Sequence, residues 1–325
     1  MPAPIPVGLI GAGKHGERYL RHIVEDVPEL RLALLCRQDA RAGREQAAQA
    51  GARYVGDFRE LVASPEIAAV IAVVPPVWNV EICTLAASSG KAILVEKPLA
   101  VTVDRGLEIH DEVRRAGVPL MVGHTLRFNA VVRTVRSAIE RIAPIHQLWL
   151  SQRFEPSRLA WLDDPAMSGG GNVIHTGVHG FDLLRHFTGR DPHSVFAATS
   201  RVTTTRTEDN FVAVFAFPEP LVAGVAGSRA TASRSGAIEI SGERGQIVAD
   251  HVGGFATLVT GLTRTALDVP AQLPSVREAL RAFARSLHER SPMPITLEDG
   301  LWAVAMAEAC YRSIELDRAV PVRRL

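Results

Sequence analysis

Cysteine is scarce in this sequence, and no sign of charge predominates. The three cysteines among 325 residues, Cys36, Cys83 and Cys310, lie far apart and lack the spacing of metal ligands. We interpret them as small buried hydrophobic residues in a reducing compartment. Lysine and arginine number 36 against 35 aspartates and glutamates, a net charge of +1. Nothing in this balance indicates nucleic acid or a membrane surface as a partner.

Signals for export or membrane insertion are also missing. Residues 1–5 contain neither a basic segment nor a sustained apolar stretch, unlike a signal peptide. The apolar run 67–78 is too short to span a bilayer and contains two prolines. We therefore expect a soluble, cytoplasmic protein.

The length is typical of two domains, and the hydrophobic pattern changes once along the chain. Up to residue 123, apolar runs alternate with helical patterns, which predicts βαβ units and a parallel sheet. Strands are expected at 6–10, 31–36, 68–74, 92–95 and 119–122, and helices at 14–27, 41–50, 79–89 and 103–116.

Beyond Arg127 the runs are longer and rich in Val, Phe and Thr, the pattern of a meandering antiparallel sheet. Strands are expected at 145–154, 194–203, 210–217, 221–230, 237–241 and 246–250, and helices at 130–142, 172–187, 275–289 and 297–315. The predicted fold is an α/β nucleotide-binding domain over 1–123 and an α+β domain with an open, mostly antiparallel sheet over 124–325. Its C-terminal helix is expected to pack back on the first domain.

Residues 11–16 have the form G-x-G-x-x-G between the first strand and the first helix. Gly11 permits the tight turn, Gly13 lets a pyrophosphate approach, and Gly16 allows close packing of helix on strand. Phosphates would bind at the helix N-terminus. We predict a dinucleotide site that also includes Lys14 and His15; the alternative is a glycine-rich connector.

The end of the second strand decides between NAD and NADP. Arg37 stands where an acidic residue would bind the adenosine ribose, and a guanidinium grips a 2′-phosphate. We therefore predict NADP(H) over NAD(H). Asp39 keeps NAD(H) as the alternative, since a small shift in register would place its carboxylate on the ribose.

The tripeptide Glu96-Lys97-Pro98 closes a short apolar strand. The carboxyl ends of strands are where open α/β sheets bind ligands. A partly desolvated lysine there loses its proton readily, so Lys97 is a candidate for proton transfer. The alternative is a surface lysine at a strand end.

A second cluster follows the glycines at 169–171. His175, His179 and Asp182 are spaced four and three apart and are expected on one helix face. The interpretations are two structural histidines, a His-x-x-x-His metal pair, or a histidine that moves a proton at a substrate hydroxyl beside Lys97. We favour the last and predict no metal.

These segments together resemble the glucose–fructose oxidoreductase/inositol dehydrogenase/MocA (Gfo/Idh/MocA) family. The resemblance spans nearly the whole chain and rests on the glycine turn and on residues 73–76, 90–100, 123–129, 169–182 and 297–300. It implies a Rossmann domain and a second domain whose open sheet forms a homodimer or homotetramer interface. It also implies hydride transfer between NAD(P) and a sugar, polyol or related alcohol or ketone, a small-molecule substrate.

The resemblance assigns roles by position. Lys97 would bind the reacting hydroxyl and the nicotinamide ribose, His179 would be the general acid/base with His175 beside it, and Pro98 would be cis. Further nucleotide contacts are expected from Pro75, Asn79, Glu96 and His124, and substrate contacts from Lys97, His175, His179, Arg153 and Trp161, with Arg158 in the same segment.

Three positions depart from the family pattern. His175 replaces the usual Asp, Asn79 replaces a frequent His, and Ala130 replaces a frequent Pro. Arg127 is expected near the cleft or as a structural link between domains. Two other functions stay open: a catalytically silent NADP(H)-binding regulator, and an elimination or epimerisation enzyme that uses a tightly held nucleotide.

Overall fold

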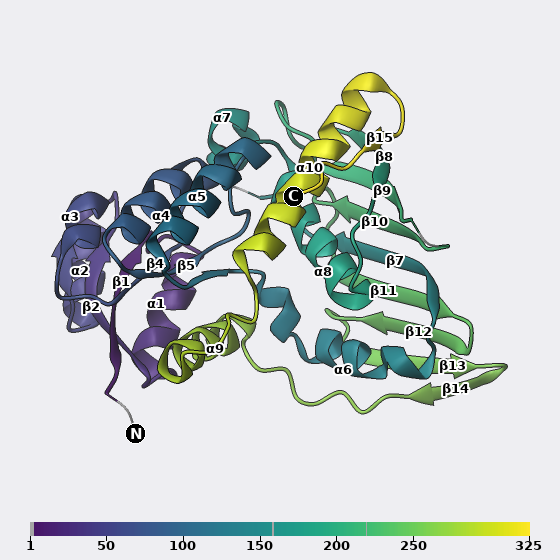
Figure 1. Ribbon diagram of the computed structural model, residues 1–325, viewed down its shortest axis with the longest axis horizontal. Helices are drawn as coiled ribbons and strands as arrows, with labels where there is room; N and C mark the ends of the chain where they lie inside the picture. The colour runs from purple at the N-terminus through teal and green to yellow at the C-terminus, as the bar shows by residue number, and fades with distance from the viewer. Residues whose placement is uncertain (1–2, 158, 219) are drawn as a thin grey trace. The chain divides into compact units, whose positions relative to one another are not determined.

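The computed structural model describes residues 3–157, 159–218 and 220–325, so Arg158 lies outside the described residues. The chain forms two compact units, shown in Figure 1. The first comprises Met1–Thr125 and Pro274–Leu301, and the second comprises Leu126–Leu273 and Trp302–Leu325. Each unit is described below by itself.

The first unit contains a parallel sheet of order β3-β2-β1-β4-β5-β6. This is the strand order of a dinucleotide-binding Rossmann fold, as predicted. Its strands are short, and β4, β5 and β6 are apolar and fully buried, because helices cover both faces of such a sheet. The strands are β1 (Ile5–Ile10), β2 (Leu30–Cys36), β3 (Arg53–Val55), β4 (Ala69–Ala72), β5 (Ala92–Val95) and β6 (Leu120–Val122).

Helices of the first unit alternate with these strands. They are α1 (Gly16–Glu25), α2 (Ala40–Gln49), α3 (Phe58–Ala63), α4 (Asn79–Ser88) and α5 (Val103–Ala116), with α9 (Ser275–Glu289) from the later part of the chain. The sequence pattern missed β3 and α3, which are too short to show a period. The helix α9 packs against α1, and Arg281 Nη2 donates to the Asp26 carbonyl at 3.0 Å.

The second unit contains a nine-stranded sheet of order β14-β13-β12-β11-β7-β10-β9-β8-β15. The expected simple meander is wrong in one respect: β7 pairs parallel with β10 and lies between β10 and β11. The strands are β7 (Ile145–Arg153), β8 (Ser194–Ser200), β9 (Asn210–Ala216), β10 (Val222–Ser228), β11 (Ser235–Gly242), β12 (Gly245–Asp250), β13 (Phe255–Thr260), β14 (Thr263–Ala266) and β15 (Val320–Pro321). The last three were not predicted.

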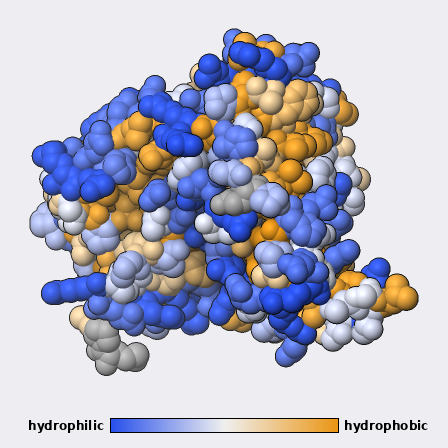
Figure 2. Space-filling view, turned by 45° about the vertical axis from the view of Figure 1, so that its right-hand side comes forward, coloured by the Kyte–Doolittle hydropathy of each residue, from blue (hydrophilic) through white to orange (hydrophobic). Residues whose placement is uncertain are grey.

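One face of this sheet is covered by helices and the other is open. In β9, Phe211, Ala213 and Phe215 are buried, whereas Val212 and Val214 are 44% and 46% exposed. Phe181 packs edge-on against both phenylalanines, with ring centroids 6.1 and 5.3 Å away. Burial of each such side chain contributes about 2–3 kcal/mol. Apolar surface appears at the right of Figure 2 among polar residues.

The covering helices are α6 (Ala130–Ala138), which lies on β12 and β13, and α8 (Val178–Thr188), which lies on β7 and β10. The short α7 (Pro165–Ser168) precedes the glycine cluster. The helix α10 (Leu297–Leu316) is assigned to the first unit up to Leu301 and to the second unit from Trp302. Within the described ranges, no helix combines the length and apolarity needed to cross a bilayer. The thiols of Cys36, Cys83 and Cys310 are all buried.

Candidate functional site

The glycine-rich turn joins β1 to α1, and its three glycines differ in what surrounds them. Gly11 has φ +91°, and a side chain there would strike the Val73 carbonyl oxygen at 2.2 Å. A Cβ at Gly16 would lie 1.7 Å from the Gly11 carbonyl oxygen, so only glycine fits. A Cβ on Gly13 would meet nothing within 4 Å. The backbone at Gly13 is therefore open to a ligand, and Lys14 and His15 beside it are exposed. These features fit a pyrophosphate at the start of α1.

Arg37 lies directly after β2 and folds toward this turn. Its Nη1 donates to the Ala12 carbonyl at 3.1 Å and to Gln46 Oε1 at 2.9 Å. Asp39 is the N-cap of α2 and accepts from the Ala42 amide at 3.1 Å. The guanidinium is thus next to the nucleotide turn, whereas the Asp39 carboxylate stabilises a helix end.

Glu96 is buried at the end of β5, and its carboxylate contacts His15 of the glycine-rich turn. Its carboxylate accepts from the Tyr19 hydroxyl at 2.5 Å, from His15 Nε2 at 2.8 Å and from the Lys97 amide at 3.0 Å. Burial raises the pKa of this carboxyl, but His15, Lys97 and the Tyr19 hydroxyl outweigh it and lower the pKa to about 2. Burial, with Glu96 beside it, raises the pKa of Tyr19 well above its usual range. Glu96 therefore positions His15 rather than standing exposed to a nucleotide.

Lys97 is half-buried between Glu96 and Pro98, and the Lys97–Pro98 peptide bond is cis, as predicted. Asn79 at the start of α4 supports both sides of the lysine. Its Nδ2 donates to the Pro98 carbonyl at 2.9 Å and to the Glu96 carbonyl at 3.4 Å. Asn79 is 1% exposed, so its position suits this support rather than a direct nucleotide contact.

Two further predicted nucleotide contacts also follow strands of this sheet. Pro75 is partly exposed after β4, near the Val73 carbonyl that meets Gly11. His124 follows β6 and is completely buried. The glycine turn, Arg37, Pro75, Lys97 and His124 thus all follow the carboxyl ends of parallel strands, the edge at which such sheets bind ligands.

The helix expected at 172–187 is not uniform. Residues Val173–Gly177 form a π turn, and α8 continues from Val178. Such turns are rare in proteins overall, but those that occur are often located at functional sites. From 171 to 184, His175 and His179 are the two residues that are not fully buried. Both histidines therefore lie on the accessible side of this segment, whereas Asp182, which was expected on the same face, is buried.

The glycines that precede this helix approach protein rather than a ligand. A Cβ on Gly171 would lie 2.1 Å from the Glu208 carbonyl oxygen, and one on Gly170 would lie 2.2 Å from the Tyr311 hydroxyl. The Glu208 carboxylate accepts from the amides of Gly171 at 3.2 Å and Val173 at 2.9 Å, and from the Tyr311 hydroxyl at 2.8 Å. A carboxylate here satisfies amides that the helix start leaves without partners.

His175 contacts two side chains of the second unit. The Trp161 ring centroid lies 5.6 Å from its own, and Arg229 Nη1 is 3.2 Å from its Nδ1. Trp161 was predicted at the substrate site, but Arg229 was not. Neither Arg229, Glu208 nor Tyr311 could be found from the sequence, because each lies more than thirty residues from its partner in the helix segment.

Arg127 forms a two-pronged ion pair inside the second unit. Its Nε and Nη2 lie 2.9 and 2.6 Å from the two carboxylate oxygens of Asp182. The side chains are 11% and 1% exposed. Arg127 is thus a structural contact within this unit, and Asp182 is engaged by a cation rather than available to a metal. Among the residues that the structure describes, no group of three His, Cys, Asp or Glu side chains is arranged to hold a metal ion.

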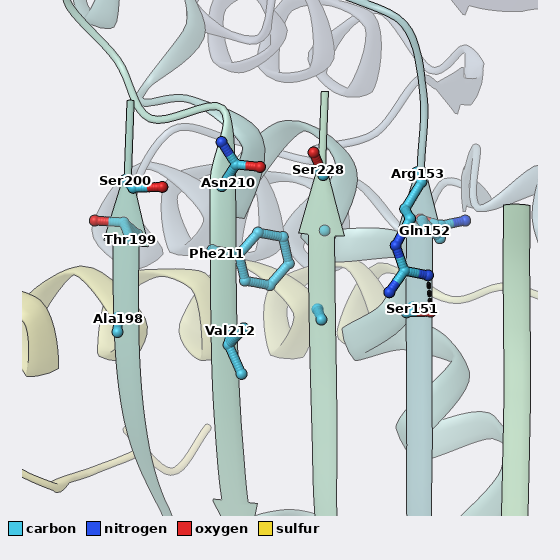
Figure 3. A pocket seen from close by; sticks show the side chains of 12 residues that line it. Ser151, Gln152, Arg153, Ala198, Thr199, Ser200, Asn210, Phe211, Val212 and Ser228 are labelled. Atoms are coloured by element: carbon cyan, nitrogen blue, oxygen red, sulfur yellow. Dashed lines mark hydrogen bonds between the residues drawn. The ribbon is translucent and has the colours of Figure 1, made fainter. Parts of the chain in front are cut away.

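Arg153 lies apart from His175. Strand alternation places it with Ser151 on the open face of the sheet, where it lines a hollow of about 370 Å³ (Figure 3). Its Nη1 donates to Ser151 Oγ at 2.9 Å and to Ser235 Oγ at 3.4 Å. The helical segment that carries His175 covers the other face of the sheet. The hollow is therefore not the site of the predicted chemistry, whatever its volume. Lys97 and His179 belong to different units.

Comparison with known proteins agrees with this geometry. Residues 5–124 match the sequence model described as the GFO/IDH/MocA oxidoreductase family, NAD-binding Rossmann fold, and residues 132–248 match that of the GFO/IDH/MocA C-terminal domain. Myo-inositol 2-dehydrogenase of Thermotoga maritima is 26% identical over 98% of this chain and 99% of its own length. 1,5-Anhydro-D-fructose reductase of Ensifer adhaerens is 28% identical over 83% and 84%.

A solved structure shares the complete fold. The aldose-aldose oxidoreductase from Caulobacter crescentus, crystallised with glycerol, superposes with a TM-score of 0.89, covering 98% of this chain and 99% of its own at 20% identity. The two matching sequence models together cover more than half of the chain and include both the glycine turn and the helix of His175 and His179. The chain therefore belongs to the Gfo/Idh/MocA family of oxidoreductases with an NAD-binding Rossmann fold.

Proposed function

We propose that this enzyme transfers a hydride between NAD(P) and a sugar, polyol or related alcohol or ketone. The observation that carries the proposal is the Glu96 network, because one buried carboxylate links the nucleotide turn through His15 to the Lys97 segment. The dehydrogenase and reductase names of the relatives support the class of substrate.

In this proposal, Lys97 binds the reacting hydroxyl and stabilises negative charge on its oxygen. His179 removes the hydroxyl proton during oxidation and returns it during reduction. The nicotinamide, when bound, supplies or accepts the hydride at its C4. We also assign His175 to the substrate site in this proposal.

The activity is tested with a panel of sugars, polyols and their ketones, followed through nicotinamide absorbance. We expect Lys97→Ala and His179→Gln each to lower kcat about 100-fold or more, as the loss of a proton-handling group does. Nucleotide affinity should change little for His179→Gln. His146→Gln is the matched control, because His146 is exposed on β7.

Two outcomes would favour the other functions. Nucleotide that co-purifies and shows no net redox change during turnover indicates elimination or epimerisation. The absence of any turnover, with Lys97→Ala leaving the cellular role intact, indicates a regulator. The oxidoreductase proposal fails in the second case.

We also propose that NADP(H) binds better than NAD(H). Arg37 next to the turn and the capping role of Asp39 support this preference. The dissociation constants of both nucleotides test it, with Arg37→Ala expected to weaken NADPH binding about tenfold and NADH binding much less, since a guanidinium–phosphate hydrogen bond contributes about 1.5–3 kcal/mol. Tighter NADH binding by the unmodified enzyme would refute it.

The open face of the sheet supports a further proposal, that two or four copies associate through it. Five apolar side chains there are 37–51% exposed, namely Trp149, Phe196, Val212, Val214 and Val222. Light scattering after gel filtration tests this, with Val214→Lys expected to give monomers because it places a charge at the centre of the face.

The buried thiols support a reducing, cytoplasmic location.

A further inference from the structure

Arg229 follows β10 and is a partly buried cation for which the described residues provide no acidic partner. Its Nη1 lies 3.2 Å from His175 Nδ1, and its Nε is buried with no hydrogen-bond partner among the described residues. Burial lowers the pKa of this guanidinium, and no carboxylate in the described part of the chain offsets the effect. A buried guanidinium is costly unless an anion compensates it.

The carboxylates nearest in sequence are committed elsewhere. Glu208 caps the helix start and accepts from Tyr311. Asp209 accepts from the amides of the turn at 202–204, including Thr203 at 2.5 Å. Neither forms a hydrogen bond with the Arg229 guanidinium, so any compensating anion must come from outside these groups.

The contact with Arg229 involves His175 as the acceptor. A guanidinium has only donors, so the hydrogen bond between Arg229 Nη1 and His175 Nδ1 requires His175 Nδ1 to accept. In this arrangement the positive charge of the pair is that of the Arg229 guanidinium. Trp161 packs against the same imidazole and provides an apolar wall.

The charge of the pair selects among anions. A single carboxylate carries one negative charge and accepts from a guanidinium and an N–H together. A phosphate monoester carries about −1.5 to −2 at neutral pH and would require a second cation.

We propose that Arg229 and His175 bind a carboxylate of the substrate, so that the enzyme acts on a sugar acid or polyol acid rather than a neutral polyol. This inference rests on the proposed oxidoreductase function. It adds Arg229 as a residue that determines substrate class.

The test compares matched substrates that differ in one group. Turnover is measured with D-gluconate and D-glucuronate, with the neutral sugar D-glucose and with D-glucose 6-phosphate. We expect kcat/KM to be at least tenfold higher for a carboxylated compound. Arg229→Gln should raise its KM about 100-fold while changing kcat less, because hydrogen bonds to charged groups are among the strongest in proteins.

Two further variants separate charge from folding. Arg229→Lys keeps the positive charge and should retain part of the preference. His175→Asp should pair with Arg229, remove the net charge and shift the preference toward the neutral sugar. Arg264→Gln on the exposed strand β14 is the matched control and should leave the preference unchanged.

Each outcome decides the inference. If the enzyme prefers D-glucose and Arg229→Gln does not alter this preference, the inference is overturned and the proposed function stands. A preference for the phosphate ester also overturns the inference. If nothing is turned over, thermal stabilisation by D-gluconate with NADPH is compared in the native chain and Arg229→Gln. If D-gluconate stabilises the native chain but not the variant, the carboxylate site is supported although the proposed function fails. If D-gluconate stabilises neither, the carboxylate site is overturned as well.

Discussion

The buried carboxylate of Glu96 should stabilise the first unit in a pH-dependent way. We consider Glu96→Gln, which keeps the shape of the side chain and removes its charge. The variant retains an acceptor for the Tyr19 hydroxyl at 2.5 Å, but it loses the attraction of His15 and Lys97. Burial alone disfavours the charged form, so the lowered pKa is the net result of these partners.

The magnitude follows from the pKa. A fall from 4.5 to about 2 corresponds to about 3 kcal/mol of stability. Because the folded pKa is the lower one, this contribution is complete above pH 5 and is lost as the pH falls from about 5 toward 2. For a unit of this size, about 3 kcal/mol shifts the unfolding midpoint by roughly 6–12 °C.

Thermal unfolding followed by circular dichroism at pH 7 and pH 3 measures the effect. We expect the midpoint of Glu96→Gln to lie roughly 6–12 °C below that of the native chain at pH 7, with about half or less of the difference remaining at pH 3. Glu25→Gln, on the exposed side of α1, is the control and should change neither value. Equal midpoints at pH 7, or a difference independent of pH, would refute the reasoning.

Three other buried contacts give shorter predictions. Asn79→Ala should lower kcat about tenfold with little change in nucleotide affinity, because it removes the donors that support Lys97; steady-state kinetics and fluorescence titration check this. Asp182→Asn should destabilise the second unit by about 3–5 kcal/mol, measured by thermal unfolding, because Arg127 would keep a buried charge. Tyr311→Phe should cost about 1–3 kcal/mol in the same assay, through the hydrogen bonds lost at the helix start, and an unchanged midpoint would contradict that account.

Much of the first unit could be predicted because its signals are local. The strand at 92–95 and the helix at 103–116 have the predicted bounds, since apolar runs and a terminal glycine mark them. The three-residue β3 gives no such signal. In the second unit, the parallel pairing of β7 with β10 joins residues that are 75 positions apart, such as Gln147 and Val222, and no local pattern indicates it.

The residues of the candidate site also differ in whether a local sequence signal marks them. Gly11, Gly16 and Lys97 could be proposed from the sequence because a fixed spacing or the end of a strand marks them. The residues that orient them were missed, because contacts such as Tyr19 with Glu96 join distant segments. The π turn at Val173–Gly177 was also hidden, because an α period describes its sequence as well.

The departures at positions 79 and 175 have different physical consequences. Asn79 donates to the Glu96 and Pro98 carbonyls, so a neutral polar side chain can support the Lys97 segment without altering its charge. At position 175, an imidazole instead of a carboxylate removes one negative charge beside Arg229. The first change keeps the support of the Lys97 segment, and the second changes the charge at the place where we propose that a substrate carboxylate binds. In our proposals, hydride transfer depends on Lys97 and His179, whereas the class of substrate depends on Arg229, so substitution of Arg229 tests the second proposal separately from the first.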